Sequence, residues 1–188
     1  MPMPPLFQRA LSLPAIGSPM FLVSFPPLVT ALCKAGVVGT FPHVNARPQP
    51  QLDAWLDEIE RELAAFRASN PDAVVAPHGI NLIVHRTNPR FEPDLEVVVQ
   101  HRVPFVITCL GNPAPVVEAV HAYGGTVFCD VTSADHARKS VHAGVDGLIC
   151  VGAGAGGHAS SQSGFSLVRE IREFWNGCLV LGGTINDG

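Results

Sequence analysis

A glycine-rich run that ends in a histidine follows an apolar segment near the carboxyl end of the sequence. Residues 148–151 are apolar, residues 152–157 include four glycines, and His158 comes next. Glycine has no Cβ atom, so the backbone can turn sharply there and approach a flat or phosphorylated ligand closely. A histidine can transfer a proton near neutral pH. The run therefore predicts a cofactor that lies against Gly156 and Gly157, with His158 facing its reactive part.

The composition is that of a folded α/β domain rather than of a disordered chain. Hydrophobic residues make up 47% of the 188 residues, and charged residues make up only 15%. The formal net charge is −4 and Lys/Arg runs are absent, which argues against nucleic acid as a partner. We recognise neither a signal peptide nor an apolar run of about 18 residues. We therefore expect a cytoplasmic protein that does not span a membrane.

The cysteines and histidines do not have the spacing of a metal site. The five cysteines are scattered, and no two of them form a CxxC pair. The eight histidines also show no metal-ligand spacing. We expect no bound metal, and we interpret the cysteines as reduced, buried residues of a cytosolic protein.

Short apolar segments alternate with longer amphipathic segments along the whole chain. The clearest helix is 51–68, where Leu52, Leu56 and Ile59 recur at spacings of three and four and so share one face. The expected strands are 13–16, 37–40, one within 77–84, 105–108, 126–130, 147–151 and 178–181. The expected helices are 26–35, 51–68, 92–101, 113–122, 132–143 and 164–175.

This alternation is typical of parallel βαβ units. No GxGxxG follows the first strand, so seven strands fit a (β/α)8 TIM barrel better than a dinucleotide-binding sheet. A complete barrel has eight strands and about 250 residues. We therefore expect one incomplete barrel domain over residues 1–188, truncated before the eighth strand. Active sites of such barrels lie at the carboxyl ends of the strands. The residues at these expected ends include Met20, Asn81, Cys109, Asp130, the run 152–158 and Gly183.

Four motifs together resemble the nitronate monooxygenase family, which comprises FMN-dependent enzymes built on a TIM barrel. They are Ser18-Pro19-Met20, Gly79-Ile80-Asn81-Leu82, Ala155-Gly156-Gly157-His158 and Gly182-Gly183-Thr184-Ile185-Asn186-Asp187-Gly188. The resemblance implies backbone contacts from the Met20 turn to the flavin, and a flavin contact from Asn81. It also implies that His158 is the catalytic base and that Gly183 begins the phosphate loop. We expect Val151 and Gly152 to lie beside the same cofactor.

The sequence departs from the family at several polar positions. Many members have Gln and Glu where Val151 and Gly154 stand, and some have Lys where Asp130 stands. A carboxylate beside the flavin would disfavour an anionic reduced cofactor. Two interpretations of Asp130 remain open here, namely contact with the cofactor and orientation of the next helix start.

The resemblance implies oxidative denitrification of alkyl nitronates with O2, with FMN as the cofactor. His158 would take the proton next to the nitro group while the flavin accepts an electron or hydride. A flavin-dependent NAD(P)H:quinone or enoyl-thioester reductase is an alternative, because it shares the fold and most motifs. An inactive truncated fragment is the other alternative. The expected partners are small molecules only.

Overall fold

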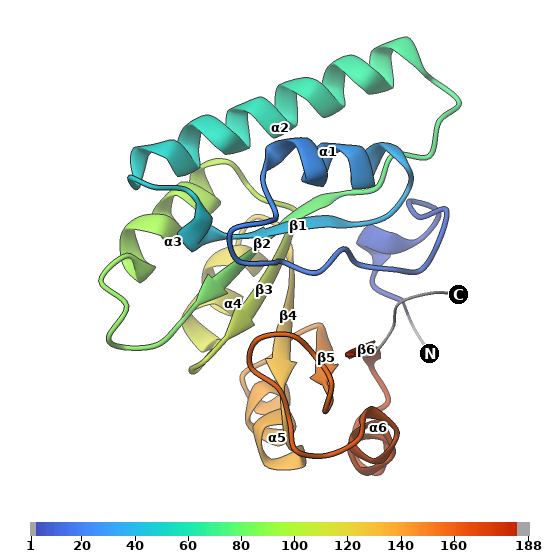
Figure 1. Ribbon diagram of the computed structural model, residues 1–188, viewed down its shortest axis with the longest axis vertical. Coiled ribbons are helices and arrows are strands. Elements are labelled where there is room, and N and C mark those ends of the chain that lie inside the picture. The colour runs from blue at the N-terminus through green and yellow to red at the C-terminus, as the bar shows by residue number, and fades with distance from the viewer. Residues whose placement is uncertain (1–2, 184–188) are drawn as a thin grey trace.

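Six parallel strands form one curled sheet in the computed structural model, which describes residues 3–183. The strands pair in chain order, and helices connect them along the outer side (Figure 1). The strands are β1 (Gly39–Pro42), β2 (His78–Ile83), β3 (Phe105–Cys109), β4 (Thr126–Val131), β5 (Gly147–Val151) and β6 (Cys178–Gly182). The helices are α1 (Pro26–Lys34), α2 (Pro50–Ser69), α3 (Phe91–Gln100), α4 (Ala114–His121), α5 (Ala134–His142) and α6 (Gly164–Arg172), with 3₁₀ turns η1 (Pro5–Phe7) and η2 (His43–Asn45). This arrangement is the expected incomplete (β/α)8 barrel.

The first expected strand, 13–16, is reduced to an isolated bridge between Ile16 and Val38. Val38 donates its N–H to Ala15 O at 3.2 Å, and Gly17 donates to Val38 O at 2.7 Å. Pro14 has no N–H, so the segment cannot extend the ladder backwards. The predicted number of seven strands was therefore wrong for the described residues, and the bridge occupies the place of the missing strand.

The second strand lies further along the chain than the expected 37–40, since β1 begins at Gly39. Val37 donates its N–H to Leu32 O at 3.0 Å and so belongs to the turn that ends α1. A Cβ atom on Gly39 would lie 2.3 Å from Val29 O, so glycine here lets α1 pack directly on the strand. The loop at the carboxyl end of β1 consequently starts two residues later than the sequence indicated, at η2.

The helices were predicted more accurately than the first two strands. Leu52, Leu56 and Ile59 are buried on one face of α2, as their spacing indicated. The hydroxyl of Ser133 accepts the N–H of His136 at 3.2 Å and caps the start of α5. The clearest difference is in α6, which ends at Arg172 instead of residue 175.

The sheet separates two apolar layers. The outer layer packs against the helices, with α1 contacting β1 and α5 and α6 contacting β4–β6 (Figure 1). The inner layer contains Phe7, Phe105 and Phe128, whose rings meet edge to face with centroids 5.1–5.8 Å apart. We call these three rings the aromatic floor, because they close the curled sheet at its amino end. The opposite, carboxyl end is the mouth.

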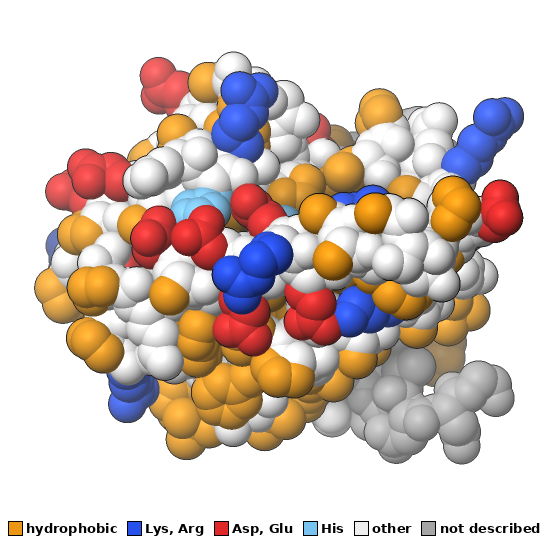
Figure 2. All heavy atoms as spheres, turned by 90° about the horizontal axis from the view of Figure 1, so that it is seen from above, with side chains coloured by type: hydrophobic (Ala, Val, Ile, Leu, Met, Phe, Trp, Pro, Cys, Tyr) orange, Lys and Arg blue, Asp and Glu red, His pale blue; other side chains and the backbone are white. Residues whose placement is uncertain are grey.

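The outer face of α2 carries charges of both signs. Figure 2, viewed from this side, shows acidic and basic side chains interspersed, with a histidine among acidic groups. His101, at the end of α3, contacts Asp53 at 2.8 Å and Glu60 at 3.4 Å on α2. These contacts tie α3 to α2 across the surface. Between residues 3 and 183, no helix is both long and apolar enough to cross a membrane.

Candidate active site at the mouth of the sheet

Three of the residues singled out from the sequence lie together on the inner face at the mouth. Side chains alternate along a strand, so Cys109 shares the inner face with Phe105, and Asp130 shares it with Phe128. The thiol of Cys109 donates to Asn81 Oδ1 at 3.6 Å. Asn81 is only 6% exposed. The structure thus brings Asn81, Cys109 and Asp130 to one end of the inner layer, as the strand-end rule predicted.

Burial controls the ionisation of this group. It raises the pKa of Asp130 to about 7. Burial, followed by the nearby charge of Asp130, raises the pKa of Cys109 to about 12, although the contact with Asn81 acts in the opposite direction. Near neutral pH the mouth therefore holds a neutral thiol beside a carboxyl group whose pKa is raised toward neutrality.

The glycine loop after β5 is anchored to the ends of both β5 and β6. Gly152 donates its N–H to Gly182 O at 3.0 Å, and Ser160 donates to Val151 O at 3.1 Å. A Cβ atom on Gly152 would lie 2.8 Å from the backbone of Gly164, so this glycine is required by the start of α6. A Cβ atom on Gly183 would lie 2.9 Å from Ala155 N, and Gly183 also has φ +112°. The loop and the end of β6 therefore lie in close contact.

Gly156 differs from the other glycines of this loop. Gly157 adopts φ +80°, which explains a glycine there. Gly156 has no left-handed φ, and no atom of residues 3–183 lies within 4 Å of the Cβ position built on it. The packing of these described residues therefore does not require glycine at position 156. The space that they leave beside it fits the close approach of a ligand, as expected for a cofactor cradle.

His158 is exposed on this loop. Within the described part of the chain, no hydrogen bond or ion pair joins its ring to Asn81 or Asp130. The structure places His158 on the loop anchored to β5 and β6, without bringing its imidazole into contact with the Asn81 group. Its catalytic role stays a prediction.

The Met20 turn is held by an asparagine that sequence reasoning missed. Asn45 donates from Nδ2 to Met20 O at 3.1 Å and to Ser24 O at 2.9 Å, and its Oδ1 accepts the N–H of Leu22 at 2.9 Å. Met20 donates its own N–H to Ser24 Oγ at 3.0 Å. The backbone groups that the resemblance assigns to the flavin are therefore bonded within the protein, and the Met20 side chain is 43% exposed.

A buried ionic network fixes the turn that carries Asn45. Asp94 contacts His43 and lies 2.8 Å from Arg90, and both Asp94 and His43 are fully buried. Arg90 also donates to Ala46 O at 2.7 Å. The network therefore contacts the chain both before Asn45, at His43, and after it, at Ala46. A strand end placed at Pro42 would have drawn attention to Asn45. His43 and Asp94, by contrast, are 51 residues apart, so no local spacing reveals their contact.

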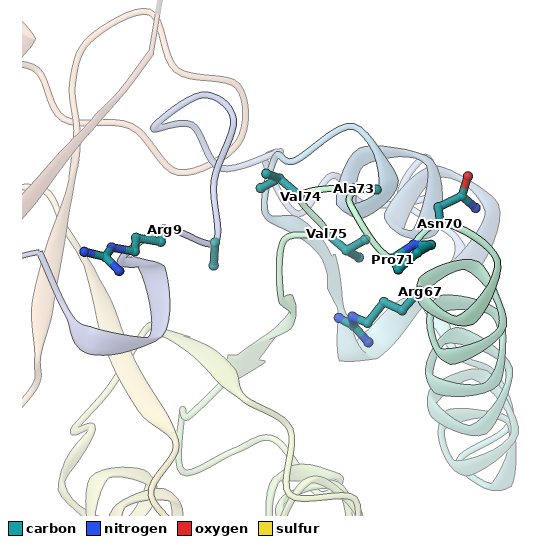
Figure 3. Close-up of a pocket in the computed structure, with 8 residues that line it drawn as sticks. Arg9, Arg67, Asn70, Pro71, Ala73, Val74 and Val75 are labelled. Carbon is teal, nitrogen blue, oxygen red and sulfur yellow. The ribbon is translucent and has the colours of Figure 1, made fainter.

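Two surface hollows lie away from the Asn81 group. One, of about 370 Å³, lies before β2 at the amino end of the sheet. Figure 3 shows Arg9 on one segment and, on the other side, Arg67 with Asn70, Pro71, Ala73, Val74 and Val75. The other, of about 670 Å³, lies between the loops after β2 and β3, and its lining includes Arg86 and Asn112. Neither is lined by the glycine loop. In the residues described, no cluster of three His, Cys, Asp or Glu side chains is arranged to hold a metal.

Comparisons with known proteins are consistent with this geometry. The family model described as nitronate monooxygenase matches residues 70–188. A nitronate monooxygenase of Neurospora crassa is 28% identical over 182 aligned residues, which cover 84% of this chain and 48% of that protein. FabK from Thermotoga maritima matches with a TM-score of 0.82 and 26% identity, covering 97% of this chain and 54% of FabK.

A structure described as nitroalkane oxidase from Streptomyces ansochromogenes shares the fold, with a TM-score of 0.75 and 22% identity. The match covers 94% of this chain and 60% of that one. The chain thus spans about half of the length of the Neurospora protein and of FabK.

Proposed function

The chain belongs to the nitronate monooxygenase family, a family of flavin-dependent oxidoreductases, and we propose that this protein uses FMN to oxidise alkyl nitronates with O2. The observation that carries the proposal is the convergence at the mouth. Asn81, Cys109 and Asp130 lie together on the inner face, and the glycine loop packs against the end of β6 at the same end of the sheet. Parallel barrels place their chemistry at this end.

The residues at the mouth suit a flat, phosphorylated cofactor. Gly156 and Gly157 leave the backbone open to a ring or a ribityl chain. The side-chain amide of Asn81 can both donate and accept hydrogen bonds at a ring edge. In this proposal Gly183 supplies the start of a phosphate-binding turn, and Val151, Gly152 and the Met20 side chain lie beside the same cofactor. The later part of the glycine-rich motif, Thr184 to Gly188, lies outside the described residues. When bound, FMN supplies the electron-accepting ring.

His158 is the proposed general base. Its imidazole nitrogen takes the proton from the carbon next to the nitro group, and the electron pair of that C–H bond remains on the substrate as the nitronate. The exposed loop position gives the ring access to solvent, to which the proton is later released. Because the loop is bonded to Gly182, His158 stays at the same end of the sheet as Asn81.

Anaerobic stopped-flow absorbance tests the reaction class. The FMN-loaded protein is mixed with ethylnitronate or with NADH, and bleaching of the flavin band is followed. Rapid bleaching by ethylnitronate, with slow bleaching by NADH, supports the proposal. Rapid bleaching by NADH alone would instead support a flavin-dependent reductase of the same fold. A protein that binds no FMN would refute both and favour an inactive chain.

Comparison of two histidine variants tests the base. His158→Asn is expected to lower the turnover of neutral nitroethane at least 100-fold and that of preformed ethylnitronate much less, because only the first substrate must lose a proton. His142→Asn, a change of an exposed histidine in the last turn of α5, is the control and should affect neither. Equal losses on both substrates for His158→Asn would remove the base from the mechanism.

A further inference from the structure

The side-chain amide of Asn81 has one hydrogen-bond partner among residues 3–183, the thiol of Cys109. The sulfur lies 3.6 Å from Asn81 Oδ1. Asn81 itself is only 6% exposed. Its register partners on the neighbouring strands are Pro42 and Ile107, whose side chains are apolar. In the part of the chain that the structure describes, the thiol is therefore the group that can decide which end of the amide faces the mouth.

The direction of this hydrogen bond follows from the chemistry of the two groups. An amide oxygen is a good acceptor, whereas a thiol sulfur is a weak one, so the S–H of Cys109 donates to Asn81 Oδ1. Burial, followed by the nearby charge of Asp130, raises the pKa of Cys109 to about 12, so the thiol keeps the proton that it donates. The second acceptor of the thiol is Leu82 O at 3.7 Å, a backbone atom of β2. Both contacts thus hold the thiol against β2.

The other end of the amide is open. Asn81 Nδ2 makes no hydrogen bond within residues 3–183. The buried side-chain atoms without a partner in that range are His78 Nε2 and Arg90 Nε, so Asn81 Nδ2 is not sealed inside the protein. Cys109 is the last residue of β3, and Asn81 stands two residues before the end of β2. The open N–H group therefore lies at the carboxyl end of the sheet, where the mouth is.

We propose that Cys109 is a positioning residue that holds Asn81 Oδ1, so that Asn81 presents its N–H, and not its oxygen, to the molecule bound at the mouth. The ligand atom placed there must then be a hydrogen-bond acceptor, such as a carbonyl oxygen or an unprotonated ring nitrogen. The identity of this ligand as FMN, whose ring carries such acceptors, rests on the proposed function. An apolar side chain in place of Cys109 would leave Oδ1 without a partner whenever the N–H is bound, which weakens binding.

Infrared spectroscopy of the S–H stretch tests the contact in the cofactor-free protein. The band of Cys109 is identified by subtraction of the Cys109→Val spectrum. A hydrogen bond to a good acceptor lowers the frequency of an S–H stretch, so the band should move to higher frequency in Asn81→Leu, which removes the amide oxygen. Asn81→Ala is the second variant if Asn81→Leu does not fold. The band of Cys178, at the amino end of β6, is the control and should not move.

FMN affinity, measured by quenching of flavin fluorescence, tests the positioning role. Cys109→Val fills the space without a donor and should raise the dissociation constant about fivefold, the effect of one lost hydrogen bond. Cys109→Ser has a hydroxyl that donates to the same oxygen, so its dissociation constant should stay within about twofold of the wild type. Cys178→Val, a change of another half-buried thiol of the inner layer, is the matched control and should leave the dissociation constant unchanged.

A double-mutant cycle shows whether Cys109 acts through Asn81. In the Asn81→Ala background, Cys109→Val should have no further effect on the dissociation constant of FMN, because the amide that the thiol positions is gone. A purely structural role of the thiol would leave the fivefold loss in place in that background.

The outcomes separate this inference from the proposed function. An S–H band that does not move in the Asn81 variants overturns the inference, as does a Cys109→Val protein that binds FMN as tightly as the wild type or a loss that persists without the amide. Failure of the wild type to bind FMN overturns the proposed function instead. The infrared measurement needs no FMN and still decides whether the thiol holds the amide.

Discussion

Removal of the Asn45 side chain should release the Met20 turn from the rest of the protein. Asn45 is 6% exposed and makes three hydrogen bonds to backbone groups of residues 20–24. A hydrogen bond contributes about 1 kcal/mol net, so Asn45→Ala loses about 3 kcal/mol if the turn stays docked. The turn carries exposed side chains and can partly detach into water, which lowers the expected loss to about 2 kcal/mol.

Urea denaturation measures this loss. With a typical slope of about 2 kcal/mol per molar urea, the midpoint of Asn45→Ala should fall by about 1 M. Asn45→Asp keeps the acceptor for the N–H of Leu22 and loses both donations, so its midpoint should lie between those of the wild type and Asn45→Ala. FMN affinity, measured by quenching of flavin fluorescence, should fall in the same order if the turn borders the cofactor.

The matched control is an exposed asparagine with one local hydrogen bond. Asn70, at the end of α2, donates from Nδ2 to Phe66 O at 3.0 Å. Asn70→Ala should lower stability by less than about 0.5 kcal/mol. If Asn45→Ala and Asn70→Ala shift the urea midpoint equally, the reasoning that Asn45 holds the turn is wrong.

Three further changes have distinct expected results. Phe7→Ala should cost about 3–5 kcal/mol in urea denaturation, because it opens a cavity in the aromatic floor. Asp130 should lower stability as pH rises from about 4 to 7, since its folded pKa near 7 lies above the ordinary 3.8 and it then holds more protons than in the unfolded chain, whereas the pKa of buried His78, lowered to about 4, acts in the opposite direction. The change in urea midpoint from pH 4 to pH 7 should therefore be more favourable in Asp130→Asn than in the wild type. Gly152→Ala should lower the free energy of unfolding by about 1–3 kcal/mol, because its Cβ atom would clash with the backbone of Gly164. Gly156→Ala should leave the stability of the cofactor-free protein unchanged and should weaken FMN binding about tenfold or more, because its Cβ atom would occupy the space of the ligand.

The fold could be predicted well where the signal is local. The periodicity along α2 and the apolar segments that became β3–β6 depend on residues close in sequence, and their bounds agree with the structure. The two amino-terminal strands were predicted less well. Pro14 removes a donor from the first, and the exit of α1 through Val37 displaces the second, so both depend on where the chain packs and not on its pattern.

The site residues, like the strands and helices, could be predicted only where the signal is local. Asn81 and Asp130 were found because a strand end is a local property, and the shared mouth follows from parallel pairing. Asn45 was missed, because its importance comes from contacts with a turn more than twenty residues earlier in the chain. The elevated pKa of Asp130 likewise could not be inferred from its neighbours in sequence, since its cause is burial by the folded sheet.

The aromatic floor also constrains how the chain can fold during synthesis. Phe7 is made early, but its partners Phe105 and Phe128 follow only after about 100 and 120 further residues. Until β3 has left the ribosome, Phe7 has no ring to meet, and until β4 follows, the aromatic floor lacks its third ring. Closure of the amino end is therefore a late event that depends on contacts between residues far apart in sequence. The inner face of the first strands stays exposed on the growing chain until then, which favours aggregation before β3 and β4 appear.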